Sequence, residues 1–363
     1  MGNSTRCHAV MEYLAEAGVE IHVLTSGNGL AYLGSKTGIA SVNAMESFFY
    51  SGKDGGVSGW STLKSLRRLA AIGRSKRAQL DSLLKRIQPQ IAVVDSEYAI
   101  SPLRRRGIPI VGLNTSEMIV TQYLKRKRVP AAVRSHFWCV EFSDYLFHRH
   151  YCDFVLSPFP LRTPTRHRKF RRIGLIVRRA VREIVPRGQP ILSPKEWNTV
   201  VFMLSGSVHA SNISFDSAQL PFNVEVVGRD GESKGKVKYH GRLMNNLDVL
   251  ARADALVMNG GYSAVSEAFQ LGKPVFVVPV PGHAEQFING CLVEDLGLGI
   301  STTETEVLPR IMAIHEQNRW VEKQGRPAVF ETDGAREAAV EILSAIKQTS
   351  GAVAGTPSLA VAF

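Results

Sequence analysis

Short apolar runs alternate with amphipathic stretches along most of this chain. A short apolar run bounded by turn-forming residues is typical of a buried strand, and apolar residues at helical spacing are typical of a helix that covers a sheet. Predicted strands lie at residues 19–24, 91–94, 108–113, 154–157, 199–204, 224–227, 255–258 and 275–279, and the clearest predicted helices at 62–88, 245–253 and 334–347. The alternation predicts an α/β protein with parallel sheets.

The chain has 363 residues, which is more than one hydrophobic core usually serves, so we predict two domains. Residues 1–175 form the predicted N-terminal domain and residues 176–349 the C-terminal one, joined by a basic segment from Arg162 to Arg182. Residues 350–363 carry no charge and are rich in Ala, Gly and Pro, which predicts a disordered tail.

The N-terminal domain begins unusually. Gly2-Asn3-Ser4 reads as a turn that runs straight into a helix, with Asn3 or Ser4 as its cap. In a doubly wound sheet such a turn follows a strand, but no strand precedes this one. We therefore expect either a start codon further upstream or a domain that lacks its central first strand.

The stretch from Asp254 to Phe269 combines an apolar run, a Gly260-Gly261 turn and an amphipathic segment that opens near Ser263. Glycines let backbone amides approach a ligand closely, and a helix N-terminus attracts an anion such as a diphosphate. Glu267, expected on the first helical turn, would repel that anion unless it accepts hydrogen bonds from a sugar diol such as ribose. The alternative is a Gly C-cap followed by an ordinary amphipathic helix, with Glu267 as a favourable N-terminal charge.

Four segments in this half resemble the donor-site half of inverting GT-B glycosyltransferases, namely family 28 enzymes such as MurG and the UDP-glycosyltransferases. They are Gly-Gly-Tyr-Ser-Ala-Val-Ser-Glu (260–267), Leu-Gly-Lys-Pro-Val-Phe-Val-Val-Pro (271–279), Gly-His-Ala-Glu-Gln-Phe-Ile-Asn-Gly (282–290) and Leu-Gly-Leu-Gly (296–299). The resemblance implies two Rossmann-like doubly wound domains that face a cleft.

The same resemblance implies the roles of donor-site residues. The turn at Asn259, Gly260, Gly261, Tyr262 and Ser263 would hold the phosphates, Glu267 the ribose, and Glu285 with Gln286 the transferred sugar. A second turn after a predicted strand, at Ser205, Gly206 and Ser207, could also meet the nucleotide, as could Arg229. His283 could donate to the phosphates or the sugar, although each of these residues is alternatively an ordinary turn, loop or surface residue.

The resembling families carry Gly-His-x-x-Arg on the acceptor side, and here this motif stands as Gly2-Asn3-Ser4-Thr5-Arg6. An Asn side chain has no useful basicity, so Asn3 can only be a polar anchor in the catalytic centre. Asp95 and Glu97, after the strand at 91–94, are the substitutes for the base, with a structural cap as the alternative for Asp95. An acceptor that is itself acidic would need little help from a base.

Charge and cysteine content restrict the partners. The net charge is +12 and the pI about 9.7, with basic clusters at 104–106, 125–128 and 162–182. These clusters could contact a membrane that carries a lipid-linked or anionic acceptor, or form a solvated face. No nucleic-acid-binding motif accompanies them. Four widely spaced cysteines without a signal peptide indicate a cytoplasmic protein.

One local cluster has metal-binding residue types: His136, Cys139, Glu141, Asp144, His148, His150, Cys152 and Asp153. Its spacing does not match paired zinc-ligand motifs, and aromatic residues are interleaved with it. We predict an aromatic core helix and no metal.

These observations lead to one hypothesis. The protein is predicted to be an inverting, metal-independent glycosyltransferase that uses a nucleotide-diphosphate sugar as donor substrate and needs no cofactor. The alternatives are a nucleotide-sugar hydrolase, an epimerase, and a nucleotide-sugar-binding homologue without activity.

Overall fold

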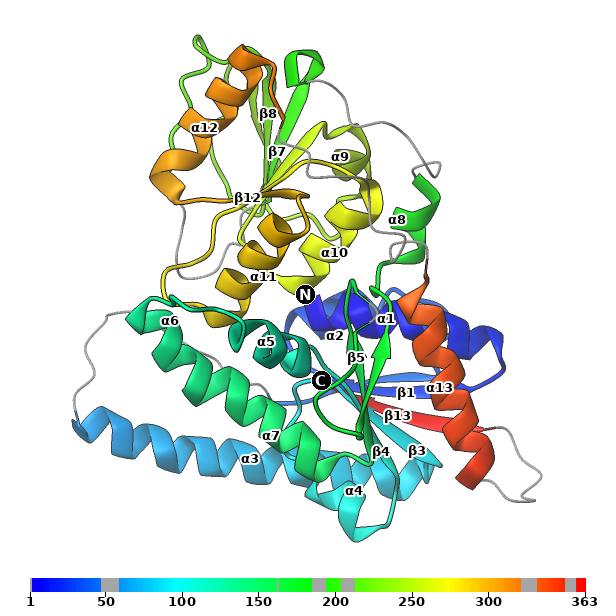
Figure 1. Ribbon diagram of the computed structural model, residues 1–363. Helices are drawn as coiled ribbons and strands as arrows, with labels where there is room; N and C mark the ends of the chain where they lie inside the picture. Colours follow the sequence, from blue (N-terminus) through cyan, green and yellow to red (C-terminus); the bar gives the residue numbers. More distant parts are fainter. Residues whose placement is uncertain are drawn as a thin grey trace.

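The computed structural model describes residues 2–46, 59–161, 163–184, 194–203, 213–320, 332–349 and 357–363, with side chains of the third helix described from residue 70. The fold has two parallel sheets, one in each domain, with helices packed around them (Figure 1). The predicted two-domain α/β architecture is therefore confirmed.

The N-terminal sheet has the strand order β2-β1-β13-β3-β4-β5-β6. Its strands are β1 (Glu20–Thr25), β2 (Ser41–Ala44), β3 (Ile91–Val94), β4 (Ile110–Leu113), β5 (Phe154–Pro158), β6 (Phe170–Ile173) and β13 (Ser358–Ala362). Its helices are α1 (Gly2–Glu16), α2 (Asn28–Leu33), α3 (Gly59–Ile87), α4 (Ser101–Arg105), α5 (Ser116–Tyr123), α6 (Ala131–His136), the π-helix η1 (Phe137–Glu141) and α7 (Phe142–Tyr151).

The C-terminal sheet has the strand order β12-β11-β10-β7-β8-β9. Its strands are β7 (Thr199–Met203), β8 (Asn223–Val227), β9 (Val237–Tyr239), β10 (Ala255–Met258), β11 (Val275–Val277) and β12 (Gly299–Ser301). The remaining helices are α8 (Arg179–Ile184), the 3-10 turn η2 (Pro194–Glu196), α9 (Leu247–Arg252), α10 (Tyr262–Leu271), α11 (Ala284–Asp295), α12 (Glu304–Gln317) and α13 (Gly334–Thr349).

The end of the chain provides the central strand of the N-terminal sheet. β13 pairs in parallel with β1 on one side and β3 on the other, so that Val361 lies beside Val23 and Val93. The prediction of a disordered tail is wrong for residues 358–362, while residues 350–356 lie outside the described residues. The position of the strand that was expected to be absent is thus filled from the opposite end of the sequence.

Two apolar layers enclose β13. Leu359 and Val361 join the cluster formed with α1 and α13, whereas Ala360 and Ala362 join the cluster on the other face of the sheet. Opposite faces follow from the two-residue repeat of a strand. Helix α13, which we had placed in the C-terminal domain, packs on α1, so the chain crosses back to the N-terminal domain before it ends (Figure 1).

Helix α1 contains a buried histidine that makes stability depend on pH. Burial, together with the charge of Lys36, lowers the pKa of His8 to about 4. The unfolded chain takes up a proton below about pH 6.5 and the folded chain does not, so stability is full above pH 6.5 and falls as the pH drops towards 4. Between pH 7 and pH 5 we expect His8 to account for a loss of about 2 kcal/mol. Urea unfolding of wild type and of His8→Asn at both pH values measures this contribution. The free energy of unfolding should fall by about 2 kcal/mol less in His8→Asn than in wild type. An equal fall in both proteins would contradict the assignment to His8.

Candidate functional site

The predicted glycine turn connects β10 to α10. Gly260 has φ of 87°, and a Cβ there would lie 2.7 Å from Val277 Cγ1 and 3.1 Å from the Gln286 carbonyl oxygen, so only glycine fits. At Gly261, the N-cap of α10, no atom of the other described residues beyond its two chain neighbours lies within 4 Å of the place of a Cβ. Asn289 Nδ2 donates to the Gly260 carbonyl at 2.8 Å and fixes the turn. The turn therefore leaves open space beside the N-terminus of α10.

This N-terminus faces the N-terminus of α1 across the domain boundary. Ser263 Oγ donates to the Gly2 carbonyl at 3.0 Å, and the Arg6 guanidinium lies 5.7 Å from the centre of the Tyr262 ring. Burial raises the pKa of Tyr262 to about 12. Two helix N-termini thus meet where the predicted phosphate turn lies, an arrangement that favours an anion.

Glu267 does not lie on the first turn of α10 as we expected, because the helix begins at Tyr262 and places it on the second. The carboxylate is buried, and both of its oxygens accept from Arg178, from Nε at 2.5 Å and from Nη2 at 2.8 Å. Arg178 Nη2 also donates to Asn246 Oδ1 at 2.8 Å. The sequence marked Arg178 only as part of the domain junction, so its pairing with the predicted ribose ligand was missed.

Glu285, Gln286 and His283 surround the start of α11. Glu285 Oε1 accepts from the Tyr262 amide at 3.2 Å, and Gln286 Oε1 accepts from the Val280 amide at 2.8 Å. Burial raises the pKa of Glu285, and burial lowers the pKa of His283, whose Nδ1 caps the helix. A carboxylate that binds the first amide of α10 holds the donor turn in place.

On the acceptor side, Asp95 is fully buried and bound by Arg6, whose Nη2 donates to Oδ1 at 2.6 Å and whose Nε donates to Oδ2 at 3.0 Å. Glu97 is also buried and lies 2.6 Å from Lys76 Nζ. Asn3 Oδ1 accepts from Arg6 Nη2 at 3.5 Å. A base must reach the proton that it removes, so the burial and pairing of Asp95 speak against this role, which stays a prediction.

Comparison with known proteins decides the family. The family model described as glycosyl transferase family 1 matches residues 1–141 and 184–314, more than half of the chain. The chain belongs to glycosyl transferase family 1. An uncharacterized glycosyltransferase of Methanosarcina acetivorans is 25% identical to this glycosyltransferase over 360 residues, which cover 90% of each chain.

Solved structures show the same fold. Os79 from O. sativa, solved in complex with UDP, aligns with a TM-score of 0.64 at 15% identity over 95% of this glycosyltransferase and 98% of that chain. MurG of Acinetobacter baumannii aligns with a TM-score of 0.51 at 14% identity over 95% and 96%. The GT-B fold that the donor-site motifs implied is therefore confirmed.

The glycosyltransferase has a polar network on the acceptor side that the sequence did not reveal as one site. Asp144 accepts from the Tyr98 hydroxyl at 2.8 Å and from Asn114 Nδ2 at 2.9 Å, and lies 3.1 Å from His148 Nδ1. Burial alone would raise the pKa of Asp144, but these bonds, with that of His148 the largest, lower it. Glu141 ends the π-helix η1, which contacts α11 of the C-terminal domain. Burial, and then the charge of Glu285 on α11, raises the pKa of Glu141.

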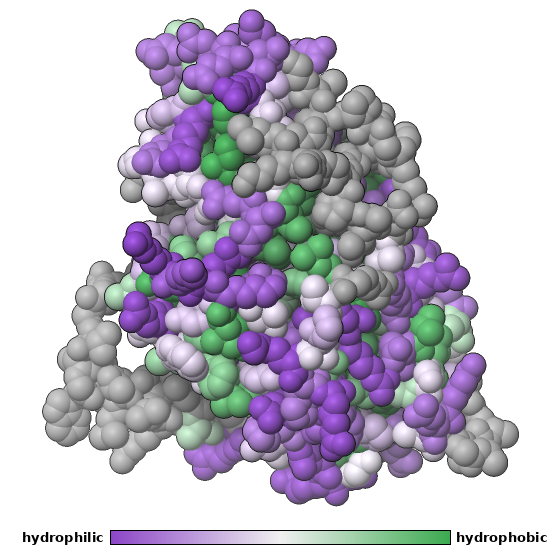
Figure 2. Space-filling view, in the orientation of Figure 1, coloured by the Kyte–Doolittle hydropathy of each residue, from purple (hydrophilic) through white to green (hydrophobic). Residues whose placement is uncertain are grey.

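The basic junction forms pairs within the chain. Among its described residues, five arginines bind acidic partners: Arg171 with Glu341, Arg172 with Glu117, Arg178 with Glu267, Arg179 with Glu16 and Arg182 with Asp333. Figure 2 shows hydrophilic residues over large areas of the upper and lower parts of one face, with hydrophobic residues visible between them. Among the described residues, no helix is both long and apolar enough to cross a membrane. Membrane contact stays a prediction.

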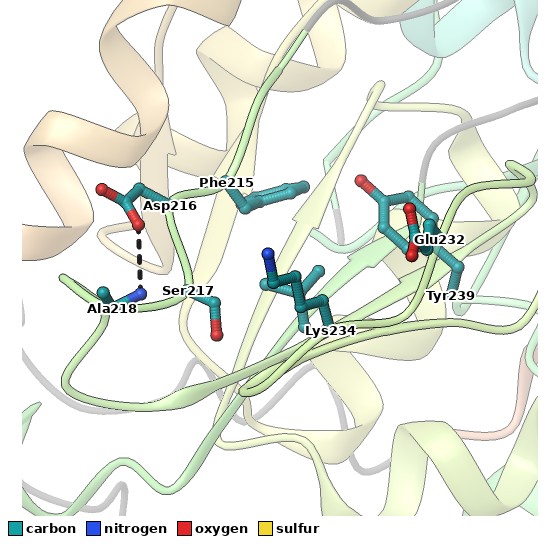
Figure 3. Close-up of a pocket in the computed structure, with 8 residues that line it drawn as sticks. Phe215, Asp216, Ser217, Ala218, Glu232, Lys234 and Tyr239 are labelled. Atoms are coloured by element: carbon teal, nitrogen blue, oxygen red, sulfur yellow. Dashed lines mark hydrogen bonds between the residues drawn. The ribbon is translucent and has the colours of Figure 1, made fainter.

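The remaining predicted donor residues are the turn at 205–207 and Arg229. Ser205, Gly206 and Ser207 lie outside the described residues. Arg229 Nη1 donates to the Ile213 carbonyl at 3.4 Å. Beside β9, a pocket of about 340 Å³ is lined by residues that the sequence did not single out, with Phe215 and Lys234 pointing into it (Figure 3).

Proposed function

We propose that this glycosyltransferase moves a hexose-type sugar from a nucleotide-diphosphate sugar, with UDP as the expected nucleotide, to an acceptor with inversion at the anomeric carbon. The observation that carries the proposal is the open Gly260-Gly261 turn at the N-terminus of α10, opposite the N-terminus of α1. The helix amides would stabilise the charge that develops on the departing diphosphate.

In the proposed reaction the acceptor oxygen attacks the anomeric carbon as the bond to the diphosphate breaks, and the acceptor proton passes to a base or to water. The donor substrate supplies the leaving group, so the proposal requires neither a cofactor nor a metal ion. Because Asp95 and Glu97 are both ion-paired and Asn3 lacks basicity, we propose an acceptor with an acidic hydroxyl. Titration calorimetry against UDP-sugars and TDP-sugars, followed by transfer assays with phenolic and aliphatic alcohols, tests the proposal.

The pairing of both acceptor-side carboxylates also favours a second candidate, a homologue that binds nucleotide sugars without transferring them. Tight binding without product for any acceptor would support this candidate. Free sugar released in proportion to the donor consumed, in the absence of an acceptor, would instead indicate a hydrolase. Absence of binding to every nucleotide sugar would sink the transferase proposal itself.

Replacing Glu267 by Ala is expected to weaken nucleotide binding by about 1–3 kcal/mol if the carboxylate holds the ribose diol, because polar groups are then left unpaired. Removing the carboxylate also leaves Arg178 without the ion pair that it forms with Glu267. Calorimetry with UDP measures the change. Glu306→Ala is the matched control, since Glu306 is half-exposed and its carboxylate, within the described part of the chain, forms an ion pair only with Arg310 of the same helix. Equal affinity of wild type and Glu267→Ala would remove the ribose assignment.

A further inference from the structure

Three metal-binding side chains from both domains meet beside the donor site. His136 ends α6, Glu141 ends the π-helix η1, and His283 caps α11 of the C-terminal domain. One ligand atom of each lies within 4.8 Å of the other two. His136 Nδ1 lies 3.8 Å from Glu141 Oε1, and the two imidazole ring centres are 4.9 Å apart.

The π-helix explains why two of these residues share one side of their helix. In an α-helix, residues five apart are rotated by about 140° around the axis, since each residue turns by about 100°. The Phe142 amide instead donates to the Phe137 carbonyl, the five-residue bond of a π-turn. The wider turn brings Glu141 back towards His136, and π-turns of this kind are frequent at functional sites.

The ligand set has the chemistry of a transition-metal site. Two imidazoles and one carboxylate are a common three-ligand set for Zn²⁺, with a fourth position left to water. Ligand atoms of a tetrahedral zinc lie about 3.3 Å apart, given bonds of about 2.0–2.1 Å. Side-chain movements of about an ångström would therefore close the triad on an ion. The hydrogen bonds of both histidine rings to backbone amides, at 3.4 and 3.5 Å, are long and easily exchanged.

We propose that His136, Glu141 and His283 bind one divalent transition-metal ion of the Zn²⁺ class and thereby link the two domains. This goes beyond the proposed sugar transfer, which needs no metal. His283 lies two residues before Glu285, whose carboxylate binds the first amide of α10. An ion in the triad ties the start of α11, and through Glu285 the donor turn, to the helix of the acceptor domain.

The test uses the full chain, stripped of metal with a chelator and titrated with ZnCl₂ and, separately, CoCl₂. One equivalent of Zn²⁺ is expected to bind by calorimetry and to raise the Tm, and one equivalent of Co²⁺ to give the visible absorption of a site with nitrogen and oxygen ligands. His136→Ala and His283→Ala should each weaken binding by at least about tenfold and abolish the rise in Tm. These outcomes do not depend on sugar transfer, so they can succeed or fail independently of the proposed function.

Two controls separate this site from other ligands. Cys139 is exposed on the same π-helix and is a free thiol, so Cys139→Ser must keep the wild-type affinity. His150→Ala replaces a histidine on α7 outside the triad and must do the same. Absence of stoichiometric binding by the wild type overturns the proposal, as does binding that survives both histidine variants or is lost in Cys139→Ser.

Discussion

Replacing Val361 by Asp is expected to destabilise the N-terminal domain strongly. Val361 is 2% exposed in the central strand of a sheet, between Val23 and Val93. The substitution removes a buried apolar side chain and places a carboxylate among the apolar side chains of the cluster. We expect a cost of at least about 4 kcal/mol, which is comparable to the whole stability of many domains, about 5–15 kcal/mol. Urea unfolding followed by circular dichroism measures it.

The matched control makes the same change at an exposed valine. Val340 is 58% exposed on α13, so Val340→Asp should change stability by no more than about 0.5 kcal/mol. If Val361→Asp unfolds at the same urea concentration as wild type, β13 does not occupy the centre of the sheet. A similar loss in both variants would point to a general effect of added negative charge.

The strands that the sequence predicted were those with a short apolar run next to a clear turn. β3 and β10 match the runs at 91–94 and 255–258, and α3 matches the helical spacing at 62–88 within three residues. β13 was missed because Leu359-Ala-Val-Ala362 stands in an uncharged segment rich in Ala, Gly and Pro, and its partners lie more than 260 residues away in the sequence. A local sequence pattern cannot show that a strand from the end of the chain completes the sheet of the N-terminal domain.

In the candidate site, too, the sequence predicted the features that are local and missed the contacts between distant residues. The Gly260-Gly261 turn follows from local sequence, because a strand, two glycines and a helix are contiguous. Two ion pairs of the site join residues that are 89 positions apart in the sequence. They are Glu267 with Arg178 and Asp95 with Arg6. Such pairs depend on how two domains or two elements pack, and neither charge nor spacing in the sequence identifies the partner. Asp95 was therefore predicted as a candidate base or a structural cap, whereas the structure shows it in a buried ion pair.

The buried pair between Arg6 and Asp95 gives the second large expected effect. Arg6→Met should destabilise the protein by about 3–5 kcal/mol, because it leaves the fully buried carboxylate of Asp95 without its cation. Arg6→Met combined with Asp95→Asn removes both charges and should recover at least half of that loss, since no uncompensated ion remains. Urea unfolding of the two single variants and the double variant measures the coupling.

The double variant also decides what Asp95 does in the reaction. Both of its carboxylate oxygens bind Arg6 and its side chain has no exposure, so an acceptor hydroxyl has no path to it in this arrangement. We expect the double variant to bind UDP and to keep measurable transfer, with Asp95 positioning α1 through Arg6. Transfer by Arg6→Met, but none by a folded, UDP-binding double variant, would instead assign the acceptor proton to Asp95. It would also imply that the ion pair opens when the acceptor binds, because the carboxylate must exchange one bond to Arg6 for the bond to the hydroxyl.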